Sequence, residues 1–149
     1  MSDGFETQLL RGLARLLAAA GHGTWRETGA YQASETAICL DVFPATPDQV
    51  ISLTAYPVDD DPALSDSTIA IQVRTRAGDP NTVRDLDSAI FTSLHGRHGF
   101  TTPADGAAGI RVVQCLRHSG VGLGMDESGR WGRSSNYYLD VHRPSTFRQ

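Results

Sequence analysis

Hydrophobic residues near the start of the chain recur at spacings of three and four, with charged residues between them. This spacing predicts an amphipathic helix with one apolar side. Ser2 or Asp3 is expected to cap its start, and Gly21 to end it, because glycine readily adopts the left-handed conformation that closes a helix. The residues on the apolar side are Phe5, Leu9, Leu13, Leu16, Leu17 and Ala20.

Between residues 24 and 76 the pattern changes to short runs rich in β-branched and aromatic residues, which proline and glycine separate. Such runs predict strands joined by turns. In the fourth run, Ile69, Ile71 and Val73 alternate with polar residues. The sheet is therefore expected to have one core face and one polar face that is available for partners. The four strands are expected near residues 24–27, 36–43, 49–56 and 68–76.

A second helix is predicted directly after these strands. Asp79 is a suitable cap, and Pro80 fits the first helical position because no backbone hydrogen bond is needed there. Gly96 is expected to end the helix. The apolar side of this helix is predicted to consist of Val83, Leu86, Ile90 and Leu94.

Two more strands are expected, near residues 109–118 and 131–142. In the second of them, Tyr137, Leu139 and Val141 are predicted to alternate inward. The glycine-rich segment between the strands, residues 119–130, is expected to be a long hairpin loop. The tail beyond Arg143 is expected to fray.

These elements predict the α+β class, with a mainly antiparallel β-sheet and two helices packed on one face of it. The expected order is α-β-β-β-β-α-β-β. This is the simplest arrangement that buries both apolar helix sides. The length of the chain fits one domain, residues 1–149.

The thirteen basic residues are all arginine, and the formal net charge is −4. The absence of lysine excludes a Schiff-base lysine, a phosphate-loop lysine and a lysine general base. The acidic balance argues against a protein whose main task is to grip nucleic acid. No basic leader or long apolar run is present, so we expect neither a signal peptide nor a membrane span.

No catalytic, cofactor or metal site is predicted. His95 and His98 are separated by a glycine at the expected helix end, so their rings would not share a helical face. Cys39 and Cys115 lack the spacing of metal ligands and are expected to be buried thiols. No G-x-S-x-G motif occurs, although residues distant in sequence can still assemble a hydrolytic site. An enzyme with an unrecognised site therefore remains an alternative.

Three groups of residues are predicted to form contacts with other protein subunits. The acidic residues of the expected loop between the third and fourth strands are Asp59, Asp60, Asp61 and Asp66, for which a solvated loop or a metal site remains the alternative to a contact. The hairpin loop contributes Gly122 and Gly124. The third group consists of Arg130, at the end of this loop, and Trp131 and Arg133, which follow it. Arg and Trp are enriched where interfaces carry their binding energy.

Three long segments resemble one known family. They are LTAYPVDDDPALSDSTIAIQVRTR (Leu53–Arg76), AIFTSLHG, and VVQCLRHSGVGLGMDESGRWGRSSNYYLDVHRP. Together they resemble the minor capsid family of tailed bacteriophages of actinobacteria, whose members are similar in element order to tail terminator proteins. The resemblance covers residues 53–144, whereas the first fifty residues match only in pattern.

The resemblance implies a structural virion protein and no enzymatic activity. It implies a homo-hexameric ring at the head-proximal end of the tail tube, made in the host bacterial cytoplasm. The tail tube protein and the neck proteins of the head would be its partners, and DNA would pass through the lumen without specific binding. Another neck component or a small ligand-binding module remains an alternative.

Overall fold

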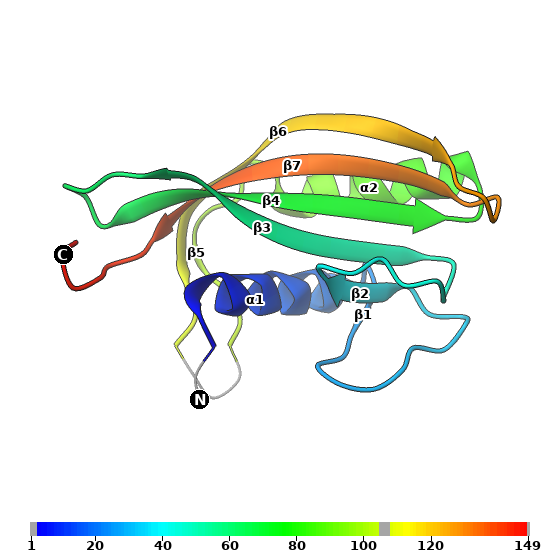
Figure 1. Cartoon of the computed structure of the whole chain (residues 1–149), viewed down its shortest axis with the longest axis horizontal. Helices are drawn as coiled ribbons and strands as arrows, with labels where there is room; N and C mark the ends of the chain where they lie inside the picture. Colours follow the sequence, from blue (N-terminus) through cyan, green and yellow to red (C-terminus); the bar gives the residue numbers. More distant parts are fainter. Residues whose placement is uncertain (1–2, 105–107, 149) are drawn as a thin grey trace.

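The computed structural model describes residues 3–104 and 108–148, which form one curved sheet and two helices (Figure 1). The sheet has seven strands in the order β1-β2-β3-β4-β7-β6-β5. The helices are α1 (Phe5–Ala19) and α2 (Pro80–Leu94). The strands are β1 (Thr24–Trp25), β2 (Ala37–Leu40), β3 (Val50–Asp60), β4 (Asp66–Ala77), β5 (His98–Thr101), β6 (Arg111–Met125) and β7 (Trp131–His142).

The sheet is antiparallel except at one side, where β1 pairs with β2 and β2 with β3 in parallel. The predicted fold class and element order are therefore confirmed. The structure adds one short strand that the sequence did not predict, β5, which lies between α2 and β6 and pairs with Arg111, Val112 and Gln114.

Both helices lie on the same face of the sheet. Leu53 of β3 lies opposite Val73 of β4, and Ile71 of β4 lies opposite Tyr137 of β7, so these side chains point to one face. The leucines of α1 cover this face over β2 and β3, and α2 covers it over β4 and β7. All of the predicted inward residues of β7 are buried, because this face forms the core.

The helix ends follow mostly from local signals. The Asp79 carboxylate accepts a hydrogen bond from the backbone N–H of Thr82 at 2.9 Å, which caps α2 as predicted. Gly21 and Gly96 follow the two helices with φ values of 86° and 82°. The cap predicted for α1 is wrong at Asp3, because the helix starts after Gly4 and has no side-chain cap. The Asp3 carboxylate instead pairs with Arg11 at 3.1 Å, and Ser2 lies outside the described residues.

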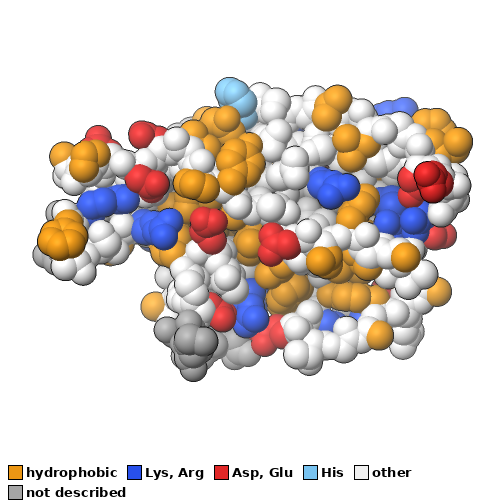
Figure 2. Space-filling model, in the orientation of Figure 1, with side chains coloured by type: hydrophobic (Ala, Val, Ile, Leu, Met, Phe, Trp, Pro, Cys, Tyr) orange, Lys and Arg blue, Asp and Glu red, His pale blue; other side chains and the backbone are white. Residues whose placement is uncertain are grey.

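No described helix covers the other face of the sheet, which Figure 2 shows. The prediction of a polar face is only partly right, because hydrophobic side chains are scattered among the polar ones there. Tyr138 lies on this face and stacks against His118 with ring centroids 4.4 Å apart. Tyr56 and Val121 are 40% and 58% exposed. This face is therefore a mixed surface rather than a purely polar one.

Candidate assembly surfaces

The predicted acidic loop is mostly strand. Asp59 and Asp60 belong to β3 and Asp66 to β4, because the two strands stay paired as far as Asp60 opposite Ser67. Only Asp61 lies in the turn, where its carboxylate accepts the backbone N–H of Ala63 at 2.7 Å. The acidic residues therefore form a narrow, fixed hairpin tip instead of a loop.

The C-terminal segment is fastened to this tip, which corrects the expectation of a frayed tail. Arg148 Nε donates to the carbonyl of Leu64 at 2.8 Å, and Arg148 Nη2 donates to Ser67 Oγ at 2.8 Å. Its guanidinium also lies 3.6 Å from the Asp60 carboxylate. The neighbouring Phe147 is 92% exposed, so an aromatic ring is held outward by an anchored backbone.

Three exposed apolar side chains therefore lie at this end of the molecule. Val58 of β3 is 44% exposed, and Leu64, in the turn that follows β3, is 59% exposed. Phe147 adjoins Arg148, which bonds to the carbonyl of Leu64. We call these three residues the tip patch. Figure 1 shows the tip of the β3–β4 hairpin and the C-terminus together at the left-hand end of the long axis.

The predicted loop between the last two strands is also mostly strand. β6 continues to Met125, because Val121, Gly122 and Gly124 pair with β7. The register shifts between Gly122 and Gly124, and Gly124 adopts a φ of 76° that favours glycine. The loop is thus reduced to the segment 126–130.

Asp126 holds this short turn in place. Its carboxylate accepts the backbone N–H groups of Ser128 and Arg130, both at 2.9 Å. The backbone N–H groups of Arg130 and Ser128 lower the pKa of Asp126. The Arg130 side chain, which is 14% exposed, pairs with the same carboxylate at 3.1 Å and donates to the carbonyl of Ala45. The Arg130 side chain therefore stabilises the turn within its own subunit, and little of it is exposed to a partner.

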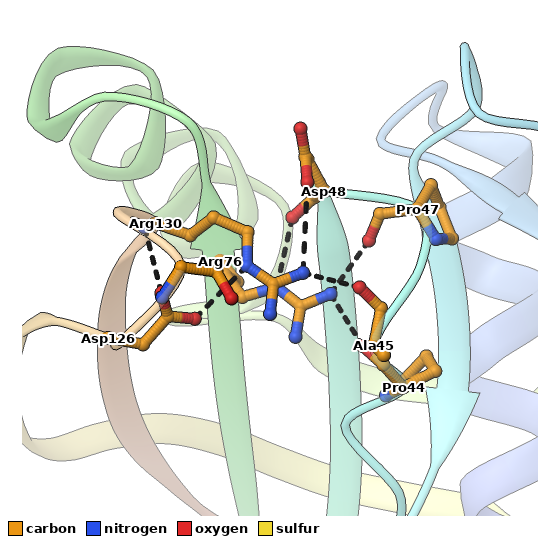
Figure 3. Close-up of polar contacts among 8 residues, drawn as sticks. Pro44, Ala45, Pro47, Asp48, Arg76, Asp126 and Arg130 are labelled. Carbon is orange, nitrogen blue, oxygen red and sulfur yellow. Dashed lines mark hydrogen bonds and ion pairs between the residues drawn. The ribbon is translucent and has the colours of Figure 1, made fainter.

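A second arginine lies beside it (Figure 3). Arg76 is 4% exposed, and its guanidinium donates to the carbonyl oxygens of Asp48, Pro44 and Pro47 at 3.0, 2.5 and 2.7 Å. Burial lowers the pKa of Arg76. The Phe43 ring packs against this guanidinium, with its centroid 4.7 Å from Arg76 Cζ. These contacts fasten the loop before β3 to the centre of the sheet.

The remaining predicted contact residues come together in one place. Gly122, Gly124, Trp131 and Arg133 line a hollow of about 260 Å³ with the first turn of α2. We call it the β6 hollow, and its other lining residues are Pro80, Val83, Arg84 and Gly132. A Cβ atom added to Gly122 or Gly124 would meet no atom within 4 Å. The hollow exists because these two glycines leave space beside α2.

The structure therefore divides the predicted contact residues between two ends. The acidic residues lie at the hairpin tip, and the glycines, Trp131 and Arg133 lie around the β6 hollow. Figure 1 shows these ends on opposite sides of the long axis, where the β3–β4 tip and the β6–β7 turn lie.

Sequence reasoning missed a buried carboxylate that fastens α2 to the sheet. Asp87 is 2% exposed, and its carboxylate accepts Ser135 Oγ at 2.8 Å and Arg133 Nε at 3.3 Å. Arg117 lies 3.9 Å away. Asp87 stands four residues after Val83 in the predicted helix, so its position on the buried side could have been noticed.

Part of one sheet edge has no partner among the described residues. The backbone N–H groups of Cys115 and Arg117 still bond to the segment after α2. Beyond them, no described residue pairs with the outer edge of β6 from residue 118 to residue 125. This segment contains neither proline nor a charged side chain, and it exposes Val121 and Leu123. Such an edge readily pairs with a strand of another chain.

The other edges are protected. β1 is two residues long and β5 is four. The outer half of β3, beyond the residues that pair with β2, contains Pro57 followed by Asp59 and Asp60. Proline lacks a backbone donor and edge charges resist pairing, so these edges are poor templates for a further strand.

Four hollows lined by described residues are small. Their volumes are about 160–260 Å³, whereas ligand sites usually enclose roughly 300–1,000 Å³. No cluster of three or more His, Cys, Asp or Glu side chains suited to a metal ion occurs among residues 3–104 and 108–148. Cys39 and Cys115 are buried, as predicted. In the described part of the chain, no helix is long and apolar enough to cross a membrane.

Comparison with known proteins identifies the family of this chain. The family model described as bacteriophage tail terminator protein matches residues 16–143. The chain belongs to this family. It is therefore a structural component of the phage virion that assembles with other tail and head proteins. The family match confirms the tail terminator resemblance and extends it into the first fifty residues.

One solved structure supports the fold. A chain in a structure described as the virion of a native gene transfer agent particle aligns with a TM-score of 0.58 and 14% identity. The alignment covers 92% of this chain and 93% of that chain. At this identity the likeness concerns the fold alone. Among curated proteins, none matches the chain significantly.

Proposed function

We propose that this protein, as a single tail terminator-like domain, forms a hexameric ring on the head-proximal end of the tail tube. The ring caps the tube and presents its other face to the neck proteins of the head. One observation supports this proposal best. The edge of β6 is open from residue 118 to residue 125, whereas the other edges of the sheet are protected.

The difference between the edges suggests how growth of a tube can be stopped. The unpaired backbone groups of β6 can accept an extended strand from the tail tube protein. The protected edges at β1 and β3 cannot pass the same pairing to a further subunit, because β1 is short and β3 carries Pro57 and two aspartates. A subunit that accepts a strand at one edge, and offers no second open edge to a further subunit, stops the growth of the tube.

The charge of the chain agrees with passage of DNA through the ring without specific binding. The formal net charge is −4, and arginines such as Arg76 and Arg130 bond to backbone carbonyls within the subunit. A tight grip on phosphates needs free basic side chains on one face. No catalytic step is part of this proposal, because the small hollows suit protein contacts better than substrates.

The open edge gives a direct test. Lysine at Val121 and Leu123 together should leave folding intact, since both side chains are exposed, and should block strand pairing at β6. Purified tail tube protein would be polymerised with the wild type or with the double variant, and tube lengths measured by electron microscopy. We expect the wild type to limit tube length and the variant to allow continued growth.

Val113→Lys is the matched control. Val113 is an exposed residue of the same strand, but it lies where β5 already covers the edge. This variant should cap tubes like the wild type. If the double variant capped tubes as well as the control, the β6 edge would not be the surface that meets the tube.

A further inference from the structure

The tip patch combines an exposed aromatic ring with an anchored backbone. Phe147 is 92% exposed although Arg148 fixes the backbone beside it through bonds to Leu64 and Ser67. Because the backbone beside Phe147 is already held, burial of this ring in a complex costs only the freedom of its two side-chain torsions. Aromatic anchors of this kind often carry most of the binding energy of an interface.

The β6 hollow has the size and lining to receive such an anchor. Its volume of about 260 Å³ is below that of most ligand sites. Val83 and Trp131 supply apolar walls, and Gly122 supplies an open floor because no side chain fills the space. The hollow therefore suits one large apolar side chain of another protein.

The charges around the two surfaces are complementary. Asp59 and Asp61 flank the tip patch, and neither forms an ion pair with a described residue. Arg84 lines the β6 hollow, and its polar contact among the described residues is with the uncharged Asn81, at 2.9 Å. Aspartates of one copy beside Arg84 of another would form new ion pairs at the rim of the contact.

We propose that the tip patch of one copy docks into the β6 hollow of the next copy around the ring, with Phe147 inserted beside Val83 and Trp131. Asp59 and Asp61 then face Arg84 of the neighbour. The tip of the β3–β4 hairpin and the β6–β7 turn lie at opposite ends of the long axis (Figure 1), so the contact joins two different surfaces of neighbouring copies, as in a head-to-tail ring. This inference rests on the proposed ring and identifies the contact that closes it.

Two variants block the two halves of this contact separately. Phe147→Ala removes the anchor, and Gly122→Val fills the hollow at a position where an added Cβ meets no atom within 4 Å. Each variant alone is expected to weaken association between copies by about 30-fold or more, because a central anchor is lost or excluded. Val113→Ala is the control, since this exposed residue lies outside both surfaces. Thermal unfolding should show that all three variants fold like the wild type.

The mixture of the two blocked variants tests the direction of the contact. Each variant retains one intact surface, so one intact contact per pair remains possible. We expect a heterodimer by native mass spectrometry, but no ring. The charge contact is tested by Asp59→Arg with Asp61→Arg, which should weaken the ring, and by adding Arg84→Asp, which should restore it.

The outcomes separate the contact from the ring itself. The masses would be measured with tail tube protein present. If the wild type forms a ring and Phe147→Ala and Gly122→Val form it equally well, the proposed contact is wrong and the proposed function stands. If both variants lose the ring but their mixture gives no heterodimer, the head-to-tail contact is wrong. If the wild type forms no ring, the proposed function fails together with this inference.

Discussion

Replacing the buried carboxylate of α2 tests how the helix is held on the sheet. Asp87→Ala removes the acceptor of Ser135 Oγ, and Ser135 is only 1% exposed. An unsatisfied buried hydroxyl costs about 1–3 kcal/mol. The variant also loses attraction to Arg133 and Arg117, whose side chains are 31% and 36% exposed. Because solvent screens such pairs, they add about 0.2–1 kcal/mol each.

The expected loss of unfolding free energy is therefore about 2–3 kcal/mol, after allowance for the desolvation that the buried carboxylate no longer suffers. Urea unfolding followed by tryptophan fluorescence would measure it. With a slope of roughly 1–3 kcal/mol per molar urea, the midpoint should fall by about 0.7–3 M. Asp87→Asn is the control, because it keeps an acceptor for Ser135 and loses only the charge. A loss below about 0.5 kcal/mol for Asp87→Ala, or equal losses for both variants, would refute this account.

Three further predictions concern buried groups. Arg76→Met leaves three backbone carbonyls without their donor and should lower the unfolding free energy by about 2–4 kcal/mol, whereas Arg76→Lys should cost less; denaturant titration measures both. Burial lowers the pKa of His22, whose ring bonds to Ser93 Oγ at 2.6 Å, so the unfolded chain takes up the proton more readily. Stability should therefore hold above the ordinary pKa of 6.5 and fall as pH drops below it, and unfolding curves at several pH values should show a smaller fall for His22→Gln. Burial raises the pKa of Cys115 to about 12, so at pH 8 about one thiol in ten thousand is ionised, and labelling by a thiolate-selective reagent should be slow until urea unfolds the chain.

The sequence by itself determined the elements whose signals are local. The cap of α2 at Asp79 and the helix ends at Gly21 and Gly96 were predictable, because capping bonds and left-handed glycines act within a few residues. β7 was predicted with the bounds that the structure has, since alternating Tyr137, Leu139 and Val141 mark a strand with one buried face. These patterns were also sufficient to predict the α+β class.

Tertiary structure decided the length of β6 and the existence of β5. The glycines of β6 favour a loop when only the sequence is considered, but pairing of most β6 residues with β7 extends the strand to Met125. β5 has only Phe100 as a large apolar residue, and it forms because β6 lies beside it. Strand pairing depends on residues far away in the chain, so no local pattern contains it.

The candidate site divides in the same way. The sequence identified the acidic residues and the Trp131 region by residue type, but it did not reveal that they lie at opposite ends of the molecule. It also missed Phe147, whose position depends on the bonds of Arg148 to a hairpin that is distant in sequence. Residue types and short-range spacing are properties of the chain alone. The bond of Arg148 to Leu64 and the shared hollow of Gly122 and Val83 depend instead on strand register and helix packing.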